Sequence, residues 1–254
     1  MNAPLTRRSL IGAGLTLPLL ALPGCANFIS AYRYDSALRR LLAYSSHRAF
    51  ASLLRDRGFY QDQVAQVTLP AQLGGSGAVI QLAPLLQTPA MQDNLLRLVN
   101  AAATDAARYA APLITQAIRG IDVRTAVKVI RGGPTAATDF LHRSMGNAVY
   151  DAMLPAIGNA LRAQDNGTLT RALQAAGNFG FAALQHDVAY KASEGIYRAI
   201  GREEASIRVD PASTDDDLLE AIFKPLGPSR SDARRRRRRA AQAVQTPAAE
   251  VSQP

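Results

Sequence analysis

The chain has 254 residues, one cysteine, three histidines and a formal net charge of +9. A single cysteine excludes an intrachain disulfide, and histidines as far apart as His47, His142 and His186 predict neither a metal site nor a catalytic nucleophile. The charge lies mostly at the ends, because Arg7 and Arg8 contribute two units and residues 230–254 a net five, which leaves only +2 on residues 25–229.

Residues 1–24 have the three parts of an export signal. A basic start precedes an apolar run at 10–22, which is too short to span a bilayer because a span needs about 20 apolar residues. The run ends in Leu22-Pro23-Gly24-Cys25, which resembles the lipobox of bacterial lipoproteins. We therefore expect cleavage before Cys25 and lipidation of its thiol, and an ordinary secretory signal is the alternative.

Two short features of the sequence bear on the export route and the destination. Thr6-Arg7-Arg8-Ser9-Leu10 resembles the twin-arginine export motif, and a plain arginine pair in a general signal is the alternative. Ala26, rather than an aspartate, follows the cysteine, which resembles sorting to the outer membrane. We expect a protein anchored to the periplasmic face of the outer membrane, with the membrane as its partner through Cys25.

Residues 36–227, after a tether at 25–35, predict a single, mainly α-helical domain of about seven or eight helices. The first helix should end near Gly58. Residues 61–89 predict an irregular or short β segment, because apolar residues alternate loosely there before a glycine-rich loop. The longest helix is expected at 91–117, where apolar residues recur at three- and four-residue steps, with Pro112 bending or breaking it.

Helix signals continue to the end of the domain. Asp122 predicts the start of a short helix that stops at Gly132, and Pro134 predicts the first residue of a helix that runs to about 154. A turn at Asn166-Gly167 precedes two expected helices, at 168–185 and 186–205. The sequence Ser213-Thr214-Asp215-Asp216 predicts a capping box for a last helix that ends near residue 223.

Residues 228–254 predict a disordered tail, because an arginine block is followed by alanine, glutamine and proline with little to bury. The block could attract the chain to an anionic envelope surface, which near a membrane is worth about 1 kcal/mol per basic residue. A tail without a function is the alternative. Nucleic acid is not an expected partner of an exported chain. The block consists of Arg234, Arg235, Arg236, Arg237, Arg238 and Arg239.

Four stretches carry a family resemblance that spans most of residues 36–226. They are Leu98-Val99-Asn100-Ala101-Ala102-Ala103, the segment 121–138, Leu154-Pro155 and, most specifically, 196–211 with its Glu203-Glu204 pair. The chain resembles the bacterial domain-of-unknown-function family 4197, except that Thr104 follows the alanines where the family has glutamate. The resemblance implies an exported, mainly helical protein and brings no established activity.

Two groups of polar residues are candidate ligand or partner sites. Asn100, Thr104 and Arg108 form a line beside the apolar stripe of the expected long helix, with Asp105 next to them. The second group, near the C-terminus, is an acidic and basic cluster for which structural ion pairing is the alternative. It consists of Glu203, Glu204 and Arg208.

The sequence predicts no catalytic residue, cofactor or metal ligand. We expect a tethered, non-catalytic domain that binds an unknown protein or an apolar envelope ligand in a groove lined by leucine, alanine and tyrosine. The alternative is a carboxylate-dependent envelope hydrolase that uses Glu203 or Asp105. Such an enzyme requires two acids in one cleft, at least one of them with a perturbed pKa.

Overall fold

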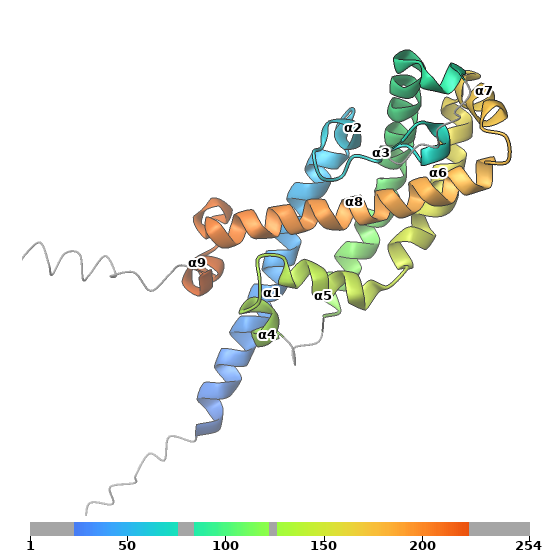
Figure 1. Cartoon of the computed structure of the whole chain (residues 1–254). Coiled ribbons are helices and arrows are strands. Elements are labelled where there is room, and N and C mark those ends of the chain that lie inside the picture. The colour runs from blue at the N-terminus through green and yellow to red at the C-terminus, as the bar shows by residue number, and fades with distance from the viewer. Residues whose placement is uncertain (1–22, 76–83, 122–125, 224–254) are drawn as a thin grey trace, which may run out of the picture.

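The structure, a computed structural model, describes residues 23–75, 84–121 and 126–223, and these contain nine α-helices and no β-strand (Figure 1). The mainly α-helical domain is therefore confirmed. The helices are α1 (Pro23–Leu53), α2 (Gly58–Gln61), α3 (Pro89–Arg119), α4 (Ala126–Ile130), α5 (Ala136–Met145), α6 (Ala148–Gln164), α7 (Thr168–Ala175), α8 (Phe181–Val209) and α9 (Asp217–Phe223).

Four long helices enclose the core. Helix α8 crosses α1 and α3, and α6 packs against both α3 and α8 (Figure 1). The core is rich in leucine and alanine: Leu38 and Leu42 of α1, Leu95 of α3 and Ile200 of α8 are fully buried. Each such leucine or isoleucine contributes about 1.5–3 kcal/mol by leaving water. Alanines on α3 such as Ala106 let the neighbouring helices approach closely, because they occupy little space.

The segment 62–69 contains neither helix nor strand, and its backbone is hydrogen-bonded to side chains rather than to a neighbouring strand. The amide of Asn100, on α3, accepts from the Val67 N–H and donates to the Val67 carbonyl, both at 2.8 Å. From α8, the Lys191 ammonium donates to the carbonyl of Thr68 at 3.0 Å. These hydrogen bonds pair backbone N–H and C=O groups that a neighbouring strand would pair in a sheet. The expectation of an irregular segment is therefore confirmed for residues 62–69.

Two helix boundaries differ from the sequence-based expectation, and glycines with positive φ lie at both. The helix expected from Pro134 to residue 154 is split into α5 and α6, since Gly146 has φ 52° and ψ −127°, a conformation that other residues rarely adopt. The expected break at 185/186 was also wrong. The chain leaves α7 through Gly177, which has φ 65°, and α8 starts after Gly180.

Pro112 neither ends nor interrupts α3, and the expected break there was wrong. Ala110 and Ile114, on either side, are fully buried, and their packing favours the continuous helix. The expected capping box at 213–216 was also incorrect, since residues 211–214 form a 3-10 helix. Asp216 alone caps α9, because its carboxylate accepts from the N–H groups two and three residues later.

Several expectations concern parts of the chain outside the described residues. They are the export signal up to residue 22, the cap at Asp122, and the tail 228–254 with its arginine block. The segment 25–35, taken as a tether, lies in the first part of α1. Among the helices that the structure describes, none is both long and apolar enough to cross a membrane.

Candidate functional site

A groove with mostly apolar walls runs between α1 and α3 and has a volume of about 630 Å³. We call it the apolar groove. Small side chains on the facing surfaces of the two helices leave this space open. The lining residues are Ala43, Ser46, His47, Phe50, Ala51 and Leu54 from α1 or just after it, and Ala111, Thr115, Ile118 and Arg119 from α3.

One polar atom in the wall of the apolar groove has no hydrogen-bond partner. Ser46 is 5% exposed, and its Oγ makes no hydrogen bond within the described part of the chain. The neighbouring Ser45 on the same helix instead donates to the carbonyl one turn earlier, at 2.7 Å. A buried hydroxyl without a partner costs about 1–3 kcal/mol, and such atoms in native proteins often face a ligand or water.

A second cavity, of about 510 Å³, adjoins the apolar groove, and Leu54 lines both. It lies between the corner that joins α1 to α2, the middle of α3 and the end of α6. We call it the arginine cavity, because four guanidinium groups line it. Its other residues are Leu54, Asp56, Tyr60, Ala101, Thr104, Asp105 and Gln164, and the arginines are Arg55, Arg57, Arg97 and Arg108.

Three of the polar residues predicted from the sequence therefore meet in this cavity: Thr104, Asp105 and Arg108. They lie within about one turn of α3, which places them on neighbouring positions of its surface. The Asp105 carboxylate accepts from Gln164 of α6 at 2.7 Å. Sequence spacing alone could find this group, but not Arg55 and Arg57, which come from the corner after α1.

A network around Tyr60 forms one wall of the arginine cavity. The Tyr60 hydroxyl donates to Asp93 at 2.7 Å, and Arg97 forms an ion pair with the same carboxylate at 2.7 Å. The hydrogen bond from Tyr60, and then that from Arg97, lowers the pKa of Asp93. The same hydrogen bond raises the pKa of Tyr60, because it holds the phenol proton. Arg97 also lies 5.5 Å from the centre of the Tyr60 ring, within cation–π range.

Asn100, the remaining residue of the predicted polar line, does not line this cavity. Its side chain is 1% exposed, and all its hydrogen bonds go to the backbone of Val67 and Leu96. The residue is a structural clamp for the segment 62–69. The position of Asn100 beside the apolar stripe of α3 made it a candidate, but helical spacing does not show that the segment 62–69 packs against it.

The cluster near the C-terminus is an internal cross-link. Glu204 is fully buried, and its carboxylate accepts from the N–H groups of Ala137 and Thr138, at 3.0 and 2.7 Å, in the first turn of α5. Arg208 forms an ion pair with it at 2.8 Å and donates to the Ile130 carbonyl at the end of α4. Glu203 is separate from this cluster and contacts Arg202 at 3.3 Å.

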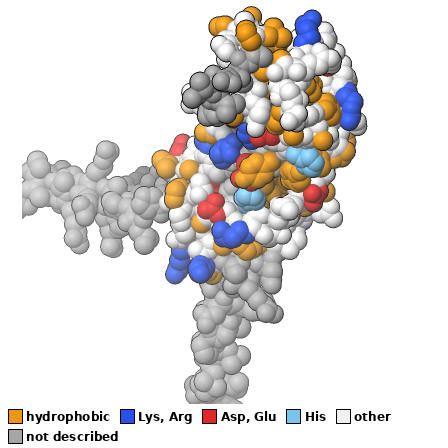
Figure 2. Space-filling view, turned by 45° about the vertical axis from the view of Figure 1, so that its right-hand side comes forward, with side chains coloured by type: hydrophobic (Ala, Val, Ile, Leu, Met, Phe, Trp, Pro, Cys, Tyr) orange, Lys and Arg blue, Asp and Glu red, His pale blue; other side chains and the backbone are white. Residues whose placement is uncertain are grey.

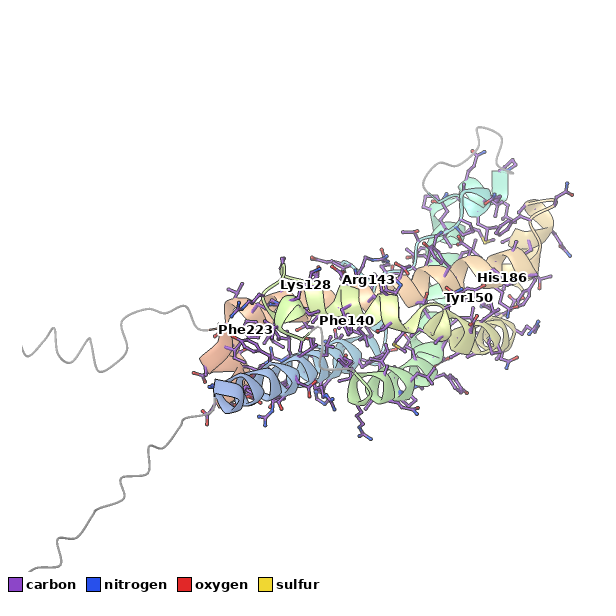
Figure 3. All side chains as sticks on the ribbon, turned by 90° about the horizontal axis from the view of Figure 1, so that it is seen from below. Lys128, Phe140, Arg143, Tyr150, His186 and Phe223 are labelled. Carbon is purple, nitrogen blue, oxygen red and sulfur yellow. The ribbon has the colours of Figure 1, made fainter. Side chains whose placement is uncertain are left out.

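A further polar cluster, on α5, α6 and α8, had no signal in the sequence. His142 lies 3.1 Å from Glu194 and stacks on Tyr197, with ring centres 4.0 Å apart. Burial, and then the charge of Glu194, raises the pKa of Tyr197 to about 12. Nearby, the Tyr150 hydroxyl is hydrogen-bonded to His186 (Figure 3). These pairs were missed because their members are far apart in the sequence.

His142 and His186 line one small cavity, and Figure 2 shows two histidine side chains among apolar ones on one face of the molecule. The ring nitrogens contact one carboxylate at His142, that of Glu194, and one hydroxyl at His186, that of Tyr150. Throughout the described residues, no group of three or more histidine, cysteine, aspartate or glutamate side chains is arranged to hold a metal ion. The cluster suits side-chain packing between helices better than metal binding.

Comparison with known proteins gives one match. A family model described as "Protein of unknown function (DUF4197)" matches residues 29–224, which are most of the chain. No curated protein and no solved structure matches.

Proposed function

The chain belongs to this family of proteins of unknown function, DUF4197, and we propose that its helical domain is a non-catalytic, lipid-anchored binding domain of the bacterial envelope. It takes an apolar ligand into the apolar groove. The observation that carries this proposal is the groove itself, whose size lies within the 300–1,000 Å³ or so that is typical of small-molecule sites.

The lining of the apolar groove suits a hydrocarbon chain. Six of its ten residues are alanine, leucine, isoleucine or phenylalanine, so a bound chain would leave water over most of its length. The gain is about 25 cal/mol for each Å² of apolar surface removed from water. Ala43 and Ala51 are exposed residues of the groove wall, and a ligand would cover them.

The proposed anchor lies on the helix that forms one wall of the groove. Cys25 is the third residue of α1, and the same helix continues to Leu53. From Cys25 to Ala43 a helix rises about 27 Å, at roughly 1.5 Å per residue. A lipid on Cys25 would therefore hold the groove at a fixed spacing along one rigid element, near a source of acyl-chain ligands.

The alternative, a carboxylate-dependent hydrolase, is supported by one observation: Asp56 and Asp105 line the same cavity. Four arginines line that cavity too, and Asp105 is already hydrogen-bonded to Gln164. Glu203, the other acid proposed from the sequence, contacts Arg202 instead. Binding is therefore the better-supported function, and the Asp105→Asn variant distinguishes the two, because only an enzyme would lose turnover of an envelope substrate.

The test is to identify what the protein carries. The mature chain is purified from the envelope of an exporting host in mild detergent and analysed by native mass spectrometry and organic extraction. We expect a bound acyl-containing molecule and a lipid on the N-terminal cysteine. The Ala51→Trp variant, which fills the apolar groove from an exposed position, should lose most of the bound molecule.

Ala183→Trp is the matched control, because Ala183 is an exposed alanine of α8 outside the two cavities. It should keep the bound molecule at the wild-type level. The proposal is overturned if Ala51→Trp and Ala183→Trp retain equal amounts of it, or if the wild-type chain carries nothing. Release of the Cys25→Ser variant from the membrane fraction checks the anchor separately, and its retention there would contradict lipidation.

A further inference from the structure

We infer that the arginine cavity binds a phosphate-type anion, and that this anion is the headgroup of the ligand whose apolar part occupies the apolar groove. The link to a lipid headgroup rests on the proposed function. The anion site itself does not, because it follows from the residues of the arginine cavity.

The charges that line this cavity are not balanced by its own acids. Four arginines face two aspartates there, Asp56 and Asp105. Arg97 is committed to Asp93, at 2.7 Å, and Arg55 donates to the Ser52 hydroxyl at 2.9 Å. The guanidinium group is the side chain best matched to phosphate, since it offers several donors in one plane.

Arg57 and Arg108 remain available for a ligand. Neither side chain makes a hydrogen bond or an ion pair within the described part of the chain, and both line the arginine cavity. Arg57 has a positive φ of 56°, which is uncommon for a residue with a side chain. Strained backbone of this kind is often found at binding sites.

Thr104 gives independent support for a ligand. It lines the arginine cavity, is only 8% exposed, and its hydroxyl has no hydrogen-bond partner among the described residues. Arg108 follows it by one turn of α3, so a hydroxyl donor and a guanidinium group lie next to each other at this wall. A phosphate oxygen is an acceptor that can satisfy both.

The two cavities suit one amphipathic molecule because they share a wall. Leu54, directly after α1, lines both: the apolar groove lies between α1 and α3, and the arginine cavity lies at the corner that leads from α1 to α2. One cavity is apolar and the other carries the arginines. A ligand that crosses Leu54 would place its hydrocarbon part and its anionic part in chemically matched surroundings.

The test compares three probes by isothermal titration calorimetry: dihexanoyl phosphatidic acid, dihexanoylglycerol, which lacks the phosphate, and inorganic phosphate. The full chain purified from the envelope is held in phosphatidylcholine nanodiscs, with empty nanodiscs as the blank. We expect phosphatidic acid to bind most tightly. Arg57→Gln combined with Arg108→Gln should weaken it by about tenfold or more, since two charge-assisted hydrogen bonds are lost.

The matched control removes two other exposed arginines, Arg143 of α5 and Arg171 of α7, which lie outside both cavities. Arg143→Gln combined with Arg171→Gln should leave the affinity within about twofold of wild type, because their effect is limited to screened long-range charge. The inference is overturned if both double variants bind phosphatidic acid equally, or if phosphatidic acid and dihexanoylglycerol bind equally.

The probes also separate this inference from the proposed function. If inorganic phosphate binds in an Arg57-dependent way and neither lipid does, the anion site stands, its source is a free phosphate, and the apolar ligand is refuted. If both lipids bind equally and inorganic phosphate does not bind, the apolar groove stands and the anion site is refuted.

Discussion

Replacing Glu204 by alanine should destabilise the domain more than any change at a neighbouring acid. The side chain is fully buried, and it accepts hydrogen bonds from two N–H groups of α5 and from the Thr138 hydroxyl. It also pairs with Arg208, whose side chain is only 10% exposed. Removing one partner of a buried ion pair costs about 3–5 kcal/mol, and losing a helix cap costs about 0.5–2 kcal/mol.

Part of that loss is offset, because Arg208 keeps its bonds to the carbonyls of Val129 and Ile130. We therefore expect Glu204→Ala to lower the free energy of unfolding by about 3–5 kcal/mol, a large share of the roughly 5–15 kcal/mol that is typical of a domain. Urea unfolding followed by circular dichroism measures the change.

Glu203→Ala is the control for this experiment. Glu203 is the adjacent residue, but its side chain is 22% exposed and contacts Arg202 at 3.3 Å, so its loss should cost only about 0–1 kcal/mol. Equal losses for the two variants, or a loss below about 1 kcal/mol for Glu204→Ala, would refute the view that the pair of Glu204 and Arg208 links α8 to α5 and α4.

The irregular segment 62–69, which follows α2, gives two further predictions. Gly195→Ala should destabilise the domain by about 1–3 kcal/mol, because an added Cβ would lie 2.6 Å from the carbonyl oxygen of Ala65. Gly133→Ala is the control and should be tolerated, because nothing lies within 4 Å of a Cβ added there. Urea unfolding of the two variants measures the difference. Burial by itself would raise the pKa of Asp62, but hydrogen bonds from Arg202 and two N–H groups outweigh it and lower the pKa. The carboxylate therefore adds stability above the unfolded pKa of about 4, which is lost as the pH falls through the folded value, and Asp62→Asn should flatten the acid limb of a stability–pH curve. An unchanged acid limb would contradict this.

Periodicity was sufficient for α3 but not for α8, which was expected as parts of two helices. Apolar residues such as Leu95 and Val99 recur at helical steps, and α3 was predicted at 91–117 against an observed Pro89–Arg119. Prolines misled the prediction, because a helix packed on both sides tolerates the lost hydrogen bond at Pro112. Glycine conformation decided the breaks at Gly146 and Gly177 instead, and a sequence does not show which glycine will adopt a positive φ.

The candidate site was predictable only where its residues share one helix. Thr104 and Arg108 lie one turn apart, so they were found together. Arg57 comes from the corner after α1 and meets them only through tertiary packing. The buried pair of Glu204 and Arg208 was predicted as a cluster, but its role as a cap for α5 depends on a contact across more than 60 residues.

The most direct test of the central proposal is quenching of a single tryptophan by brominated acyl chains. The chain has no tryptophan, so the fluorescence of each single variant comes from one position: Phe50→Trp in the apolar groove, or Phe140→Trp on α5 (Figure 3). Each variant is titrated with phosphatidic acid that carries brominated chains. The proposed function predicts strong, saturable quenching of the tryptophan at position 50 and weak quenching at position 140. Equal quenching at both positions would contradict binding in the groove.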